Sequence, residues 1–470
     1  MVDYIASAQP LRRLDSRVSV YVALLAMVAG YFLVFPIWRA QFLVEIWPTE
    51  SWNAYWQDAA AAGLPIYPES QGLTGNNYPP LSFYVIGVLA KAMHVDPLYL
   101  GRWLSLAGLA ALAFEISAAV WLLTGARVWG AAGALWYLAI MARNSTTYVG
   151  ANDPQIAGLA IMGAALVWFL KRTAADRSPL APLLLMVAGG FWKHNNIGIP
   201  IAVVGWLFLS GNRFALKSTV ASAAAAVAGL AACVVLIGQN FIPNMLAVRS
   251  YGMGTLLANV GHLQWCALAL LIWAVWAWSE RRTTQAKFTA LLIGAGLFSC
   301  LLQWLGHGVA GNAEFDLLFA LGLGLGVVLA GSDASPLALR IGVDRCRLLI
   351  VAALLLRLLA SDRQETALVV ASDAFRGTFA ETERNLILQA GQVSGVPGNV
   401  ACHTKLICRS AGKPFLVDEF KVEELLLTGN ATRKEIAAKM EANNIQVFAE
   451  TLPATPSPST SLGRWLWPTR

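Results

Sequence analysis

Apolar runs long enough to cross a membrane recur along this sequence from about residue 18 to residue 360. Charged residues are sparse within the runs, and the whole chain is 57% hydrophobic and only 13% charged. A soluble protein of 470 residues does not carry so much apolar sequence, and a membrane β-barrel shows only short alternating segments. The sequence therefore predicts an all-α polytopic membrane protein.

About eleven of these runs are expected to be membrane-spanning helices. The first run lacks a small-residue cleavage site, so we expect a retained helix and not a signal peptide. The expected spans are residues 18–37, 103–124, 128–142, 154–170, 180–192, 196–210, 218–237, 263–279, 288–305, 315–331 and 347–360.

Lysine and arginine residues orient these helices. With the N-terminus inside, the inner segments hold fifteen basic residues and the outer segments before the C-terminal region hold six. This asymmetry requires that Leu81 to Met93 does not cross the membrane, and thirteen residues are few for a crossing. We expect an interfacial helix there, within an outer loop over residues 38–102. The localisation expected is the bacterial inner (cytoplasmic) membrane, with the outer loops in the periplasm.

The character of the sequence changes after residue 360. Residues 1–360 are expected to form the transmembrane domain, and residues 361–452 a small α+β domain outside the membrane. The alternation in Ala367-Leu-Val-Val-Ala371 predicts a strand, and residues 434–442 predict a helix. Residues 453–470 are rich in Pro, Ser and Thr, and we expect a disordered tail.

Six cysteines are present, and only Cys402 and Cys408 are close together in the sequence. In the oxidising periplasm this pair is expected to form a local disulfide, although two free thiols also fit the spacing. The cysteines do not have the spacing of a zinc site, and no phosphate-binding glycine loop or nucleophile elbow is present.

The first outer loop carries a carboxylate among aromatic residues. Glu50 lies between Trp47 and the segment Trp52-Asn-Ala-Tyr-Trp56. Aromatic rings stack on sugar faces, and partial desolvation makes a carboxylate more basic, so Glu50 is a candidate general base. The alternative is an exposed loop acid beside the aromatic residues of the membrane interface.

Two later outer segments carry the other candidate groups. Asp153, between Asn152 and Pro154, is expected to cap a helix, and a capping acid can also face a cavity. Lys193 and His194 lie at the outer end of a span, against the usual charge bias, and an anionic phosphate is a suitable partner. Snorkelling of the lysine to the interface is the alternative.

Another outer helix entry, residues 306–316, contains several polar residues among glycines that permit the close approach of a ligand. The residues expected to contact substrate are Trp52, Asn53, Tyr55, Tyr78, Asn152, His307 and Asn312.

The order of these features resembles GT-C glycosyltransferases. An N-terminal span precedes a loop with an acid and Trp52-Asn-Ala-Tyr-Trp56, then come Asn77-Tyr-Pro-Pro-Leu81, the second acid Asp153, and Lys193 at an outer helix end. More narrowly, the chain resembles the branch containing protein O-mannosyltransferases and lipid A aminoarabinose transferases, whose donors are polyprenyl-phosphate sugars. The resemblance covers the architecture of about residues 15–330, and its motifs occupy short stretches.

The resemblance implies an inverting transfer of a sugar from a polyprenyl-phosphate donor to the hydroxyl of an envelope glycan, lipid or protein. Glu50 and Asp153 would be catalytic, and Lys193, His194 and Arg143 would bind the donor phosphate. The family often has an Asp immediately before the first acid, where this chain has Thr49. Members often carry His-Lys or Glu-Lys before Pro-Pro-Leu, where this chain has Asn77-Tyr78. Whether the reaction requires a divalent cation therefore stays an open question. No other cofactor is expected.

Two other classes of function fit the same features. A transporter or flippase of a lipid-linked sugar would also need an amphiphilic cavity and an outer lysine, but it would not need a base. An inactive scaffold with an outer binding domain is the third alternative. No partner of nucleic acid type is expected, because the basic residues are spread over short loops and form no stripe.

Overall fold

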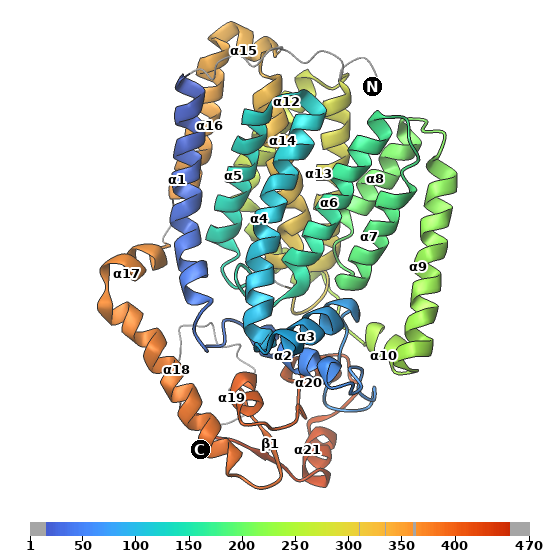
Figure 1. Ribbon diagram of the computed structural model, residues 1–470, viewed down its shortest axis with the longest axis vertical. Coiled ribbons are helices and arrows are strands. Elements are labelled where there is room, and N and C mark those ends of the chain that lie inside the picture. The colour runs from blue at the N-terminus through green and yellow to red at the C-terminus, as the bar shows by residue number, and fades with distance from the viewer. Residues whose placement is uncertain (1–15, 310, 334, 361–362, 452–470) are drawn as a thin grey trace.

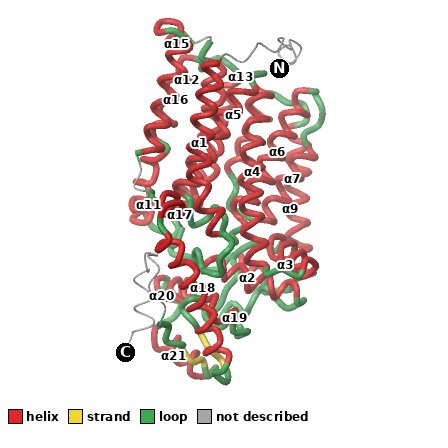
Figure 2. The backbone as a smooth tube through the Cα atoms, turned by 60° about the vertical axis from the view of Figure 1, so that its left-hand side comes forward, coloured by secondary structure: helices red, strands yellow, loops and turns green. Residues whose placement is uncertain are grey.

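The computed structural model describes residues 16–309, 311–333, 335–360 and 363–451, and the predicted disordered tail lies outside the described residues. A bundle of helices forms the upper part of the molecule, and most of the other helices and loops lie at its lower end (Figure 1). Figure 2 shows the same division, with the short strands far from the bundle.

Every predicted span coincides with helix, which confirms the polytopic all-α class. The helices of the bundle are α1 (Ser16–Arg39), α4 (Pro97–Thr124), α5 (Arg127–Asn144), α6 (Pro154–Ala174), α7 (Leu180–Trp192), α8 (Gly198–Leu209), α9 (Ala215–Ile237), α12 (Ala267–Ser279), α13 (Thr284–Trp304), α14 (Phe315–Gly331) and α16 (Val343–Leu359).

Among the described residues, six helices are individually long and apolar enough to span a membrane: α1, α4, α6, α9, α13, and α14 together with the 3-10 turn η3 (Gly311–Glu314). A seventh candidate is a bent pair of helical segments. Its first segment, residues 253–265, consists of α11 (Met253–Val260) and the 3-10 turn η2 (Gly261–Trp265), and its second segment is α12. The two segments meet at an angle of 73°. The helices α7 and α8 are shorter apolar helices. The bundle therefore mixes full-length and short helices.

Helix α14 is the centre of the bundle. Of its most apolar window, 94% is buried, whereas the corresponding fraction for α9 is 6%. A Cβ on Gly133 of α5 would lie 2.2 Å from the carbonyl oxygen of Gly322 in α14, so only glycine permits this close approach. The core of the bundle is therefore packed backbone against backbone at this point.

Two short helices lie across the lower end of the bundle, α2 (Pro48–Ala61) and α3 (Leu81–Met93) (Figure 1). They pack closely, because a Cβ on Gly87 of α3 would lie 2.2 Å from the carbonyl oxygen of Gln57 in α2. The interfacial position expected for residues 81–93 stays a prediction, and α3 is among the shorter apolar helices. The remaining short helices before residue 360 are α10 (Phe241–Met245) and α15 (Pro336–Ile341).

The chain after residue 363 forms helices and one small sheet. The helices are α17 (Glu365–Ala371), α18 (Asp373–Ser394), α19 (Lys405–Ser410), α20 (Glu419–Leu427) and α21 (Arg433–Ala442). The strands β1 (Asn399–Ala401) and β2 (Ile445–Val447) pair in parallel. The helix predicted over residues 434–442 is confirmed as α21.

The strand predicted over residues 367–371 is wrong, because this segment belongs to helix α17. The buried residues of α17 are Thr366 and Val369, which have the three-residue spacing of one helix face. The Thr366 hydroxyl donates to the carbonyl oxygen of Tyr31 in α1. Contacts with α1 therefore stabilise a helix here, although the alternation of a few residues predicts a strand.

The C-terminal region docks on the lower end of the bundle through ionic and aromatic contacts. Arg409 of α19 pairs with Asp58 of α2 and with Asp96 at the start of α4, at 2.8 and 3.0 Å. The ring of Phe415 stacks on Tyr55 of α2 at 4.9 Å. These contacts fix the region beside α2, where the candidate site residues are concentrated.

Cys402 and Cys408 form a disulfide between the end of β1 and α19. Chain-entropy arguments give about 2 kcal/mol for a loop this short. We therefore expect Cys402→Ser/Cys408→Ser to lower the free energy of unfolding of the C-terminal region by about 2 kcal/mol, as measured by pulse proteolysis in urea. Cys233→Ser, a change at a free thiol in α9, is the control.

Alkylation of the unfolded, unreduced protein tests the bond directly. Four of the six cysteines are expected to react, because four are free thiols in the structure. Reaction of all six without reductant contradicts the disulfide.

Candidate active site

A buried ion pair between Glu50 of α2 and Arg102 of α4 lies at the lower end of the bundle. The Arg102 Nε and Nη2 atoms donate to the two carboxylate oxygens at 2.5 and 2.7 Å. The same oxygens accept the backbone N–H groups of Asn152 and Ile46 at 2.9 and 3.1 Å. Both side chains are at most 1% exposed. Four donors saturate the Glu50 carboxylate, so it is arranged to hold other groups in place.

Arg102 extends this network to the chain before α2. Its remaining N–H groups donate to the carbonyl oxygens of Ala40, Phe42 and Val44. The ion pair therefore joins three segments: the chain entering α2, the start of α4, and the loop over residues 145–153.

Hydrogen bonds of side-chain amides join α2 to Asn152 of this loop. Gln57 and Asn152 exchange two hydrogen bonds of 3.0 and 2.8 Å, and the Asn53 amide donates to the Asn152 carbonyl oxygen at 2.8 Å. All three side chains are buried. Asn53 and Asn152 were predicted to contact substrate, and the structure gives both a role in fixing the loop that carries Asp153.

Asp153 caps helix α6, as predicted. Its Oδ1 atom accepts the backbone N–H of Gln155 at 2.8 Å. Its Oδ2 atom is buried and has no hydrogen-bond partner in the structure. A small pocket brings Asp153 together with Thr49, Glu50 and Tyr148. The two predicted carboxylates therefore share one pocket, and Asp153 has the oxygen that is open to another group.

Lys193 follows helix α7 and is 1% exposed. Its Nζ atom lies 2.9 Å from the ring centroid of Tyr78, in a cation–π contact. Burial lowers the pKa of Lys193 to about 7, although the negative charge of Asp153 acts in the opposite direction. Burial raises the pKa of Tyr78, and the charge of Asp153 adds to this shift. The structure thus brings together the predicted residues Lys193, Tyr78 and Asp153.

Arg249 is a second cation in this region, and it is not among the residues predicted to bind substrate or phosphate. Its charge lowers the pKa of both Lys193 and Tyr78, so it lies within electrostatic range of each. Its Nε atom donates to the carbonyl oxygen of His307 at 2.9 Å, and its guanidinium lies over the Phe420 ring. A basic residue in an outer loop, against the charge bias, was the signal available in the sequence.

Three of the residues predicted to contact substrate form contacts with the C-terminal region. The Trp52 indole donates to Asp418 at 3.1 Å. The Tyr55 hydroxyl donates to the Lys413 carbonyl oxygen at 3.2 Å. The imidazole Nδ1 of His307 lies 2.8 Å from Glu424. Trp52 also packs edge-on against Tyr78 at 4.9 Å, and Tyr78 is the residue whose ring contacts Lys193.

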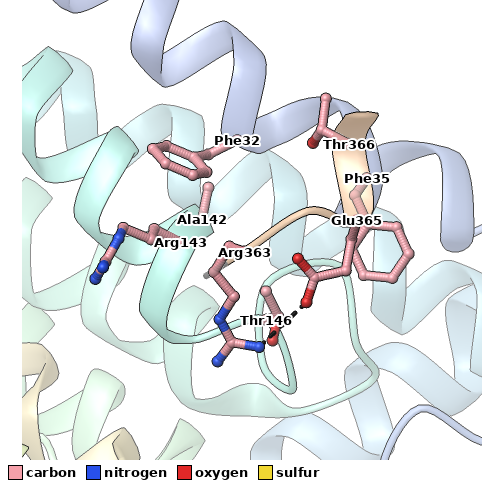
Figure 3. Close-up of a pocket in the computed structure, with 8 residues that line it drawn as sticks. All are labelled: Phe32, Phe35, Ala142, Arg143, Thr146, Arg363, Glu365 and Thr366. Carbon is pink, nitrogen blue, oxygen red and sulfur yellow. Dashed lines mark hydrogen bonds and ion pairs between the residues drawn. The ribbon is translucent and has the colours of Figure 1, made fainter. Parts of the chain in front are cut away.

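The remaining predicted residues are dispersed. His194 is adjacent to Lys193 and exposed, and Asn312 is half-buried in η3. Arg143 lines a different pocket, between α1, α5 and α17, and is not among the residues around Asp153 (Figure 3). Within the described part of the chain, no group of three or more His, Cys, Asp or Glu residues is arranged to hold a metal ion.

The architecture is a polytopic helical membrane fold, and it is the fold that the resemblance to GT-C glycosyltransferases predicted. The solved structures that it matches include ArnT from Cupriavidus metallidurans bound to undecaprenyl phosphate, with 12% identity, a TM-score of 0.54 and 89% of each chain covered. The apo state of the same ArnT matches with 13% identity, a TM-score of 0.57, and 92% of this chain and 93% of the other covered. The sequence matches no protein-family model and no curated protein. At this identity the similarity establishes the fold.

The Glu50–Arg102 pair gives a stability prediction. Arg102→Met leaves the Glu50 carboxylate buried without its counter-charge, so we expect unfolding to become easier by about 3–5 kcal/mol. The double variant Glu50→Leu/Arg102→Met removes both charges and is expected to recover part of the loss. Urea unfolding in detergent, followed by tryptophan fluorescence, measures the difference.

Arg213→Met is the matched control. It breaks an ion pair with Asp176 in which the two side chains are 65% and 64% exposed, and such pairs contribute about 0–1 kcal/mol. If Arg102→Met costs no more than Arg213→Met, the ion pair does not organise this region.

Proposed function

We propose that this protein is an integral-membrane glycosyltransferase that transfers a sugar from a polyprenyl-phosphate donor to an extracytoplasmic acceptor hydroxyl, with inversion at the anomeric carbon. The observation that carries the proposal is the proximity of a buried amine, Lys193, to a carboxylate with an unpartnered oxygen, Asp153. The fold supports it, because the ArnT of the same fold has been crystallised with undecaprenyl phosphate.

Lys193 and Arg249 are the proposed binding groups for the donor phosphate. A buried amine whose pKa is lowered to about 7 by desolvation is a group without a full counter-charge. A phosphate placed between the two cations would supply that charge and form charge-assisted hydrogen bonds. When the sugar departs, the phosphate becomes more negative, so the same two cations stabilise the transition state.

Asp153 is the proposed general base, in place of Glu50. The acceptor oxygen attacks the anomeric carbon, its proton passes to Asp153 Oδ2, and the electron pair of the breaking carbon–oxygen bond leaves with the phosphate. Asp153 Oδ1 is held by the N–H of Gln155, so Oδ2 is the oxygen oriented for this step. A single displacement inverts the configuration.

Glu50 is the proposed positioning residue of the site. It accepts the backbone N–H of Asn152, the residue immediately before Asp153, and its charge is compensated by Arg102. Thr49 occupies the position at which similar proteins often have an Asp, and it lines the same pocket as Asp153. Within this pocket Thr49 adds no acid and Glu50 is saturated by its donors, so Asp153 is the acid with an open oxygen and is the proposed base.

The proposed location is the bacterial inner membrane, with the lower end of the bundle in the periplasm. The excess of basic residues in the opposite loops supports this orientation. The disulfide between Cys402 and Cys408 also supports it, because such bonds persist in an oxidising compartment.

Asp153→Asn tests the enzyme against the alternative of a lipid flippase. We expect kcat to fall at least about 100-fold, because general bases contribute 10²–10⁴-fold, while binding of undecaprenyl phosphate is retained. The readout is mass spectrometry of envelope glycans and lipid-linked sugars in a deletion strain that carries each variant. Asp176→Asn, at an exposed acid, is the control.

In this strain the enzyme predicts a missing glycan residue and an accumulated polyprenyl precursor, restored by wild type and Asp176→Asn but not by Asp153→Asn. Full complementation by Asp153→Asn contradicts the assigned base and favours the flippase.

The pKa of Lys193 predicts a pH dependence of donor binding. Because the ammonium form is lost above about pH 7 in the free protein, affinity for undecaprenyl phosphate should decline by up to tenfold per pH unit above this value. Lys193→Arg keeps its charge and should not show this decline. Fluorescence titrations at pH 6 to 9 give the ratio of the two affinities, which cancels the titration of the phosphate itself.

A constant ratio between pH 6 and 9 contradicts an ammonium–phosphate contact at Lys193. Lys193→Met is expected to bind the lipid about 10–100-fold more weakly than wild type at pH 6, where wild-type Lys193 is charged.

A further inference from the structure

Arg249 lies in an irregular segment between α10 and α11, so no helix of its own fixes its position. This segment pairs with the chain that follows α13. The Gly252 N–H donates to the Leu305 carbonyl oxygen at 2.9 Å, and the His307 N–H donates to the Ser250 carbonyl oxygen at 2.9 Å. Because both paired segments are irregular, the position of Arg249 also depends on the element that packs on them.

Glu424 of α20 contacts both segments, and α20 lies below the bundle (Figure 1). The Oε2 atom of Glu424 accepts the backbone N–H of Ser250 at 2.6 Å, and its Oε1 atom lies 2.8 Å from Nδ1 of His307. Ser250 is the neighbour of Arg249 in the chain, and the His307 carbonyl oxygen accepts the hydrogen bond of Arg249 Nε. Glu424 is 2% exposed. One buried carboxylate therefore holds the two residues that fix the backbone and the guanidinium of Arg249.

Phe420 lies one turn earlier on α20, and its ring contacts the same two segments. The Arg249 guanidinium carbon lies 5.4 Å from the ring centroid. A Cβ on Gly308 would overlap the ring, and the φ of Gly308 is +70°, so this contact requires glycine. Helix α20 thus places one ring and one carboxylate against the chain around Arg249.

The Glu424 carboxylate orients Arg249 without pairing with it. In the described part of the chain Arg249 forms no ion pair, and its Nε atom donates to a backbone carbonyl oxygen. A carboxylate bound directly to the guanidinium would compete with a phosphate for the same N–H groups. Glu424 instead contacts a backbone N–H and an imidazole. This arrangement suits an arginine that must receive an anionic ligand.

We propose that Glu424 is a positioning residue of the donor-phosphate site and that it acts through Arg249. This inference rests on the function proposed above, in which Arg249 and Lys193 bind the phosphate. Placement matters because charge-assisted hydrogen bonds weaken when the donor and the acceptor are misaligned. The C-terminal region is therefore part of the donor site, since it supplies the side chain that places one of the two cations.

A double-mutant cycle tests this role, with the affinity of the full-length protein for undecaprenyl phosphate measured by fluorescence titration. Arg249→Met is expected to weaken binding about tenfold, and Glu424→Ala about fivefold. Because Glu424 acts through Arg249, adding Glu424→Ala to Arg249→Met should change the affinity by less than about twofold. Adding Glu424→Ala to Lys193→Met should still weaken binding about fivefold, because Lys193 is the other cation.

A conservative variant and a matched control separate positioning from general loss of structure. Glu424→Gln keeps an oxygen that can accept the Ser250 N–H, so it should retain the wild-type affinity to within about threefold. Glu423→Ala is the matched control, because the Glu423 carboxylate lies 3.6 Å from Nε2 of His307, beyond hydrogen-bond distance. We expect this control to bind the lipid like wild type.

His307→Leu replaces Glu424→Ala if that variant does not fold. It removes one of the two groups that Glu424 holds, so it should weaken binding about two- to threefold, and it should have no effect in the Arg249→Met background.

The role of Glu424 is overturned if Glu424→Ala binds the lipid like wild type, if it weakens binding equally in the Arg249→Met background, or if Glu423→Ala has the same effect. A loss in Arg249→Met without a loss in Glu424→Ala supports the phosphate site and overturns the role of Glu424 alone. Wild-type binding by Arg249→Met contradicts both.

Discussion

The ion pair between Glu50 and Arg102 is the interaction on which the lower end of the molecule depends. Neither charge is accessible to water, so each must be compensated by the other and by backbone groups. The backbone groups come from the chain before α2 and from the loop over residues 145–153. One buried pair therefore fixes the relative position of α2, α4 and the residue that precedes Asp153.

The C-terminal region also contacts the residues at the lower end of the bundle. Asp418 receives the Trp52 indole N–H, and Trp52 packs against Tyr78, which in turn holds the ammonium of Lys193. Phe420 lies under Arg249. Both cations of the proposed phosphate site are thus supported by rings whose positions depend on α20 and the residue before it. Loss of the contacts between the C-terminal region and the bundle would therefore disturb donor binding, although Lys193 and Arg249 themselves would be unchanged.

The sequence was sufficient for the bundle because apolar runs and the bias of basic residues are local properties of the chain. The helix α3 was also expected not to be a span, since Leu81–Met93 is short and its crossing would invert the charge bias. The strand predicted at residues 367–371 failed because contact with α1 is not encoded in five residues. The sequence also did not show the partners of Glu50, since Arg102 lies 52 positions away, at the end of the predicted outer loop.

The site residues divide by the same distinction between local and tertiary information. The cap at Asp153 was predictable from Asn152-Asp153-Pro154, and Lys193 from its place against the charge bias. The sequence could not show which carboxylate is free to accept a proton, because this depends on how many hydrogen-bond donors each one receives. The Glu50 carboxylate receives four donors, whereas the Oδ2 atom of Asp153 receives none in the structure. A carboxylate that must remove a proton needs an oxygen with an open lone pair. The acid most conspicuous in the sequence is therefore better suited to hold the loop, and the acid that resembles an ordinary helix cap is better suited to the chemistry.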